Sequence, residues 1–192
     1  MKIVFSFLLT AALITAVLSR PFAGEAAQET EQPRFSTGNE LSRPGNYREW
    51  IWLSSGLGMT YGPAAPAPGR APLFDNVFVT PAAYRSFLKT GTWPDQTMFV
   101  LELRSSQTEG SINKGGHFQG GVTAIEVEVK DEKRFPGKWA FYEFGSSAKT
   151  ASPLPTSARC YSCHAENGAV DNTFVQFYPT LIEVAKQKGT FK

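Results

Sequence analysis

This sequence lacks a basic stripe, a membrane-length apolar run and an internal repeat. No row of Lys and Arg interleaved with aromatic residues occurs, so nucleic acid is not an expected partner. The apolar run at residues 3–18 has 16 residues and falls short of the roughly 20 needed to cross a bilayer. Without a repeat, 192 residues with 42% hydrophobic content suit a single domain.

The first 24 residues have the layout of a secretory signal peptide. Lys2 precedes the apolar run, and small residues near Gly24 offer cleavage positions. Cleavage there removes Lys2 and Arg20, so the formal charge becomes +2 − 2 = 0. We expect export to the periplasm, with no membrane attachment after cleavage. The alternative is an uncleaved anchor helix.

Composition divides the remainder into a leader and a domain. Residues 25–45 are rich in Glu, Gln, Ser and Pro, which predicts a flexible leader. The domain is expected over residues 46–192. Residues 56–72 carry four prolines and four glycines and are expected to form a loop.

Hydrophobic patterning predicts strands followed by helices at the C-terminus. The expected strands are 47–53, 73–79, 97–104, 122–129 and 138–144, and the expected helices are 80–89, 156–167 and 173–188. Residues 105–121 read as a polar connection. About five strands with peripheral helices indicate an α+β fold, with its last motif on a C-terminal helix.

That motif is Cys160-Tyr161-Ser162-Cys163-His164, which matches C-x-x-C-H. In this pattern the two thiols add to the vinyl groups of one haem, and the histidine ligates the iron. Positions three apart share one helix face, so both sulfurs reach the same porphyrin edge. We therefore expect one covalent haem c, with Cys160 and Cys163 as attachment points and His164 as axial ligand.

Three other interpretations of the motif are weaker. A zinc site needs about four ligands, and beyond the motif the chain offers no cysteine and only His117. A thioredoxin-like redox pair requires a βαβ setting that the pattern does not provide. A structural disulfide remains the third alternative.

The sixth iron position decides between an electron carrier and an open site. No methionine or histidine follows His164, so a ligand would come from upstream. Met59, Met98 and His117 are available; we expect core packing for Met98 and surface positions for Met59 and His117.

Several segments together resemble the cytochrome P-460 family, which includes the cytochromes c′-beta. They are Asn46-Tyr47-Arg48-Glu49-Trp50, Val77-Phe78-Val79-Thr80-Pro81, Gly91-Thr92-Trp93-Pro94-Asp95, Trp139-Ala140-Phe141-Tyr142, Leu154-Pro155, residues 160–164 and Phe177-Tyr178-Pro179. The resemblance implies a mostly antiparallel sheet whose side chains line the distal face of a haem. It also implies a homodimer.

P-460 members carry a lysine cross-linked to the porphyrin and oxidise hydroxylamine. Leu101 stands where the resemblance places that lysine, and leucine has no amine to form the bond. The closer likeness is to cytochrome c′-beta, which implies a five-coordinate haem that binds small gases in an apolar pocket.

The expected distal pocket consists of Phe99, Leu101 and Phe74, with Leu103 on the same strand face as the first two. An apolar pocket without a hydrogen-bond donor would favour NO or CO over dioxygen. Glu102 and Glu143 are the possible distal acids or bases, although a solvated outward face is the alternative for both. The function hypotheses are therefore a gas-binding cytochrome, an oxidoreductase of hydroxylamine or peroxide, and an electron carrier with an unknown redox partner.

Overall fold

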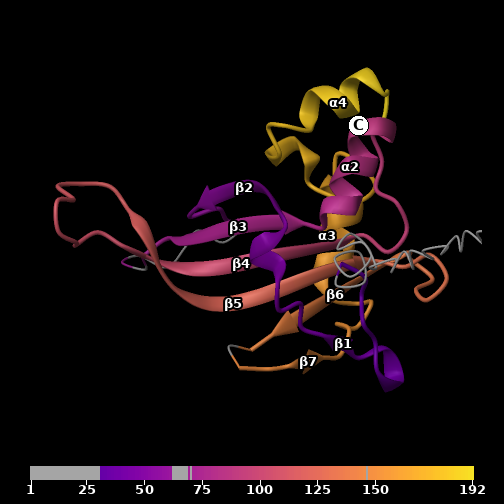
Figure 1. Cartoon of the computed structure of the whole chain (residues 1–192), viewed down its shortest axis with the longest axis horizontal. Helices are drawn as coiled ribbons and strands as arrows, with labels where there is room; N and C mark the ends of the chain where they lie inside the picture. Colours follow the sequence, from indigo (N-terminus) through magenta and orange to yellow (C-terminus); the bar gives the residue numbers. More distant parts are fainter. Residues whose placement is uncertain (1–30, 62–68, 70, 146) are drawn as a thin grey trace, which may run out of the picture.

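The computed structural model describes residues 31–61, 69, 71–145 and 147–192; the expected signal peptide at residues 1–24 lies outside them. This part of the chain forms the predicted α+β fold. Its main sheet has five antiparallel strands in the order β2-β3-β4-β5-β6 (Figure 1). Their bounds are β2 Ile51–Leu57, β3 Leu73–Val79, β4 Met98–Gln107, β5 Phe118–Lys130 and β6 Trp139–Phe144. Each strand pairs with its neighbour in sequence, which forms a meander.

Two strands are longer than the sequence pattern predicts. Residues 105–121 were expected to connect strands, but β4 continues to Gln107 and β5 begins at Phe118. Figure 1 shows this hairpin projecting from the rest of the sheet. Its cross-strand partners include Ser106 with Gln119. Backbone pairing sustains such polar strands without a buried face, so hydrophobic alternation does not reveal them.

The expectation of a flexible leader is wrong for residues 31–45. Leu41 is fully buried, and β1 (Leu41–Ser42) pairs with β7 (Thr150–Ala151) in a second, two-stranded sheet. The short helix η1 (Thr37–Asn39) precedes it, and the Tyr142 hydroxyl donates to the Asn39 carbonyl at 3.1 Å. Composition averages over a segment, whereas one well-placed leucine is enough to anchor it.

The helices follow the predicted order with two changes. α2 (Pro81–Thr90) ends at Gly91, whose φ of 75° suits glycine, and α3 (Arg159–Asn167) carries the cysteine motif. The expected helix at 173–188 is interrupted, giving η3 (Val175–Phe177) and α4 (Ile182–Gln187). Pro179 explains the break, because proline disfavours helical backbone at the preceding residue. The expected strand at 47–53 begins instead with η2 (Tyr47–Glu49).

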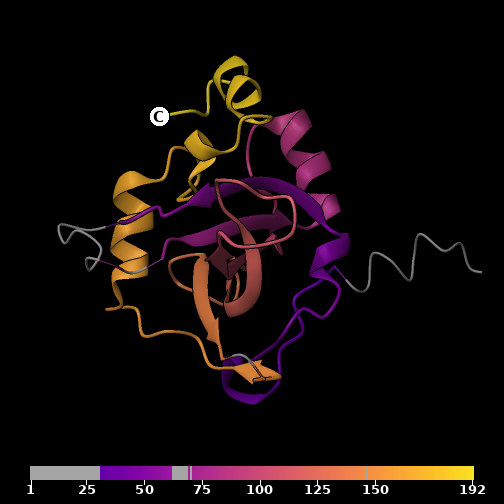
Figure 2. The ribbon, with the colours of Figure 1, turned by 90° about the vertical axis from the view of Figure 1, so that its left-hand side faces the viewer.

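The two faces of the main sheet bury different elements. Phe99 and Phe141 pack with residues of α2, α3 and α4 on one face. Val100 and Tyr142 pack with Leu41 and η2 on the other. Figure 2 shows α3 and α2 flanking the sheet, with β1 and β7 at the side away from α4. Among the described residues, no helix is long and apolar enough to span a membrane. The cysteine motif therefore faces the helix-covered side of the sheet.

Candidate functional site

The motif residues line a cavity between α3 and the main sheet. Cys160, Cys163 and His164 form part of its wall, and its volume is about 640 Å³. Both cysteines are free thiols. The opposite wall comes from β3 to β6 and is formed by Asp75, Val77, Phe99, Leu101, Leu103, Glu126, Glu128, Phe141 and Glu143. One cavity thus places two thiols and an imidazole opposite a sheet.

Two oxygen atoms hold the imidazole of His164. Its Nδ1 lies 2.9 Å from the carbonyl oxygen of Asn172 and 3.3 Å from Oε1 of Glu128. The rings of Phe141 and Phe174 lie on either side, with centroids 4.5 and 4.4 Å away. Burial lowers the pKa of His164, but the Glu128 carboxylate and the Asn172 carbonyl outweigh it, so this pKa lies above its ordinary value. The Asn172 carbonyl accepts from Nδ1, and the Glu128 carboxylate, whose Oε1 makes no hydrogen bond within the described residues, favours a proton there by its charge. This leaves the Nε2 lone pair for a metal.

A tight turn presents the Asn172 carbonyl to His164. Val170 and Thr173 pair across it, and the central residues Asp171 and Asn172 both have positive φ, at 48° and 62°. This is the type I′ geometry that Asp and Asn tolerate better than other non-glycine residues. The turn lies close to the end of α3, since a Cβ on Gly168 would come within 2.6 Å of the Asn172 carbonyl carbon.

The sheet wall contains two of the three predicted pocket residues. Leu101 and Phe99 line the cavity, and Leu101 lies in a cross-strand row with Val77, Glu126 and Glu143. Their role toward a haem stays a prediction. Phe74 does not line the cavity, because side chains alternate along β3 and its neighbours Leu73 and Asp75 take the cavity face.

The two predicted acids lie on opposite faces. Glu143 lines the cavity with an exposed side chain. Glu102 points away from it and is 3% exposed, where it accepts hydrogen bonds from Tyr47, Arg48 and Arg104. Burial raises the pKa of Glu102, but these donors lower it by more, so the pKa lies below its ordinary value. Glu102 is therefore neither solvated nor a distal acid.

Three carboxyl groups of the cavity were missed by sequence reasoning. Asp75 is 7% exposed, and burial raises its pKa from 3.8 to about 6. Burial, together with the charges of Glu143 and Asp75, raises the pKa of Glu126. Glu128 completes the set beside His164. The expectation of a purely apolar pocket is wrong, since carboxyl side chains line its sheet wall, and a carboxyl group is a hydrogen-bond donor whenever it is protonated. The alternation of Glu126 and Glu128 with valines was the available signal.

The upstream candidates for a sixth ligand are also separated. Met59 lines the cavity, whereas Met98 is buried in the core of the other face and His117 is exposed on the β4–β5 hairpin. Within the described ranges, no group of three or more His, Cys, Asp and Glu residues is arranged to hold a metal ion by itself. Two thiols and one oriented imidazole beside a large cavity fit a covalent haem instead.

Comparison with known proteins agrees with this chemistry. The family model described as Cytochrome P460 matches residues 44–175. The match includes all five strands of the main sheet, α3 and the turn that holds the Asn172 carbonyl. None of the curated proteins compared with the chain matches it.

Proposed function

The chain belongs to the cytochrome P460 family, and from this we propose that it is an exported mono-haem c-type cytochrome that binds a small ligand such as NO or CO. Membership in the family makes it a haem-binding cytochrome. Covalent attachment, export and the ligand are the proposal. When bound, the haem supplies an iron that takes small ligands and exchanges electrons.

One observation carries the proposal: Cys160, Cys163 and His164 line a single cavity, and Nδ1 of His164 is already engaged by the Asn172 carbonyl. The two thiols would hold the haem through thioether bonds. His164 would ligate the iron through Nε2, in the orientation that its Nδ1 hydrogen bond fixes. The rings of Phe141 and Phe174 limit rotation of this imidazole.

The sheet wall supports a small ligand over a large substrate. Val77, Leu101 and Leu103 supply an apolar surface that excludes water. Leu101 cannot form the amine cross-link of P-460 members. Burial raises the pKa of Asp75 to about 6, so below this pH its carboxyl group is protonated and can donate a hydrogen bond to a polar ligand. Discrimination against dioxygen is then weaker than an apolar wall alone would give.

A second candidate is an oxidoreductase of hydroxylamine, and the carboxyl groups favour it. Glu126 lies between Glu143 on β6 and Leu101 on β4, and burial, followed by the charges of Glu143 and Asp75, raises its pKa. Oxidation of hydroxylamine releases protons, and these carboxylates are placed on the cavity wall to accept them. An electron carrier would need a strong sixth ligand, and Met59 is the only methionine among the described residues that lines the cavity wall.

The test begins with the mature protein exported by a host that matures c-type cytochromes. We expect the haem to resist acid-acetone extraction and to be lost from Cys160→Ser/Cys163→Ser. The ferric spectrum should be high-spin, and the ferrous protein should take up CO and NO. Extractable haem would refute covalent attachment, and a low-spin spectrum without CO uptake would favour the carrier. Turnover of hydroxylamine that Glu126→Gln abolishes would favour the second candidate.

The cellular setting is part of the same proposal. The signal-like residues 1–24 support a periplasmic location, and the family resemblance supports a homodimer. Fractionation of the host and light scattering on the purified protein test these two points. If the protein oxidises hydroxylamine, a redox partner would be needed to accept the electrons that the iron gains, and affinity capture can identify it.

A further inference from the structure

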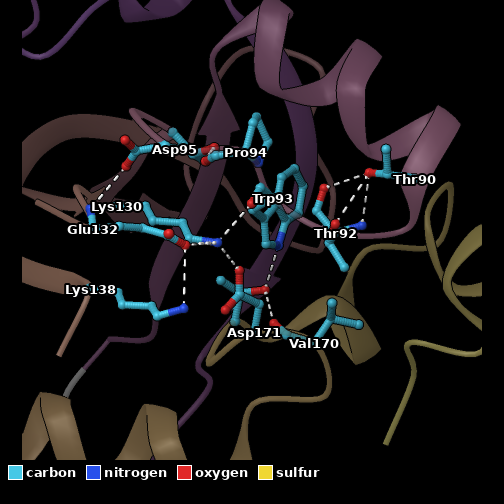
Figure 3. A network of polar contacts seen from close by, with 12 residues as sticks. Thr90, Thr92, Trp93, Pro94, Asp95, Lys130, Glu132, Lys138, Val170 and Asp171 are labelled. Carbon is cyan, nitrogen blue, oxygen red and sulfur yellow. Dashed lines mark hydrogen bonds and ion pairs between the residues drawn. The ribbon is translucent and has the colours of Figure 1, made fainter.

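A buried lysine stands at the centre of a polar network beside the turn at residues 170–173. Lys130, the last residue of β5, is 5% exposed. Its Nζ donates to the Trp93 carbonyl at 2.8 Å and lies 2.5 Å from Oδ2 of Asp171 (Figure 3). A third oxygen, Oε1 of Glu132, lies 3.5 Å away. A buried ammonium group persists only when its charge is paired and its donors are satisfied, which these oxygens achieve.

The ion pair anchors one end of the turn described above. Asp171 takes part in a backbone conformation that costs free energy for any residue other than glycine. The other end is also fixed, because Thr173 donates to the Val170 carbonyl at 2.7 Å and accepts from Nε1 of Trp93 at 2.8 Å. The turn is thus tied to β5 by a charge pair and to Trp93 by a hydrogen bond.

The next carbonyl along this turn is the one that contacts the proposed iron ligand. Asn172 follows Asp171 directly, and its carbonyl oxygen lies 2.9 Å from Nδ1 of His164. β5 also contacts the imidazole directly. Glu128 is two residues before Lys130 on the same side of the strand, and its Oε1 lies 3.3 Å from Nδ1 of His164. A displacement of Asp171 would therefore move the acceptor of His164.

We propose that Lys130 and Asp171 are positioning residues that hold the Asn172 carbonyl against Nδ1 of His164 and so set the strength of this imidazole as a donor to iron. This rests on the proposed function, because His164 ligates iron only if the chain holds haem. A well-placed acceptor at Nδ1 makes the imidazole more basic at Nε2. Loss of the ion pair releases the turn and weakens that acceptor.

The first test uses the haem-loaded protein and two variants of similar side-chain size, Asp171→Asn and Lys130→Met. We expect both to lower the iron–histidine stretching frequency in resonance Raman spectra of the ferrous protein and to raise its reduction potential. The double variant should shift no further than the larger single variant, because the two residues act as one unit. Lys138→Met is the matched control: Lys138 is 58% exposed and contacts Glu132 of the same network at 3.4 Å, and it should change neither quantity.

A second readout does not depend on the iron. The chain has two histidines, so His117→Gln leaves His164 as the single imidazole in protein labelled with ¹⁵N-histidine. In the purified chain, measured without haem and, where haem is attached, in the reduced, CO-saturated form, the Nδ1 proton of His164 should exchange with water roughly tenfold faster in Asp171→Asn than in the parent. Circular dichroism confirms that each variant is folded.

The outcomes separate the two proposals. Unchanged Raman frequency, potential and proton exchange in folded Asp171→Asn and Lys130→Met would overturn the positioning role, whatever the haem does. If the chain fails to attach haem but Asp171→Asn still exchanges this proton faster, the proposed function is refuted and the positioning of the Asn172 carbonyl by Lys130 and Asp171 stands. Equal shifts in Lys138→Met would show a general charge effect and would also overturn the assignment.

Discussion

Adjacent residues of β4 provide a matched test of which face of the sheet meets the haem. Leu101 lines the cavity, whereas Val100 is fully buried in the opposite core. Replacing each by alanine truncates one face at a time on the same strand. The two variants therefore separate a stability effect from an effect on the site.

The expected losses in free energy of unfolding follow from how deeply each side chain is buried. Val100→Ala removes two carbons from a closed core, which costs roughly 1.6 kcal/mol in transfer and up to about 3 kcal/mol with the void it leaves. Leu101→Ala removes three carbons, but this side chain is only partly buried and already borders a cavity, so about 1 kcal/mol is expected.

The assay pairs urea denaturation with stopped-flow CO and NO binding to the ferrous protein. We expect Leu101→Ala to speed ligand binding with a small loss of stability. Val100→Ala should lose more stability and keep the parental binding rates. If Leu101→Ala proved the more destabilising of the two and left the rates unchanged, the side chain would be core packing and the distal assignment would be refuted.

Three further predictions concern titration, the opposite face and the axial ligand. Because the pKa of Asp75 is raised from 3.8 to about 6, the folded state binds more protons between these values; stability present below pH 4 is lost as pH rises toward 6. Asp75→Asn should remove that slope, a change of about 1 to 3 kcal/mol in unfolding free energy measured by urea titration at several pH values; an unchanged slope would contradict it. Glu102→Gln should cost about 2 to 3 kcal/mol in urea denaturation and leave ligand binding unaltered, because it removes the charge that pairs with Arg48 and Arg104 and replaces one acceptor oxygen by an NH2 group on the far face; altered binding rates would place Glu102 at the site after all. His164→Gly should lose the native haem spectrum and regain it with added imidazole, whereas His117→Gln should keep it.

The sequence alone determined the family, the α+β class and the motif that we propose holds the haem. Each depends on local information. Cys160, Cys163 and His164 lie within one helical turn, so their spacing fixes their common face before any packing is known. The order of strands and helices follows from hydrophobic runs and from helix-start signals such as Thr80-Pro81. The cytochrome P460 match confirms the family.

Tertiary structure decided which residues share the cavity with that motif. Alternation along a strand says which side chains lie together but not which face meets the helices, so Phe74 was placed on the wrong side. Both faces of this sheet are covered, so the charged residues could not be assigned to solvent by elimination: Glu102 is buried in one core, and Glu126 and Glu128 line the cavity. The contact between His164 and the Asn172 carbonyl is made by a left-handed turn whose Asp171 pairs with Lys130, a residue distant in sequence. Such contacts arise only when separate segments pack together, and no local pattern encodes them.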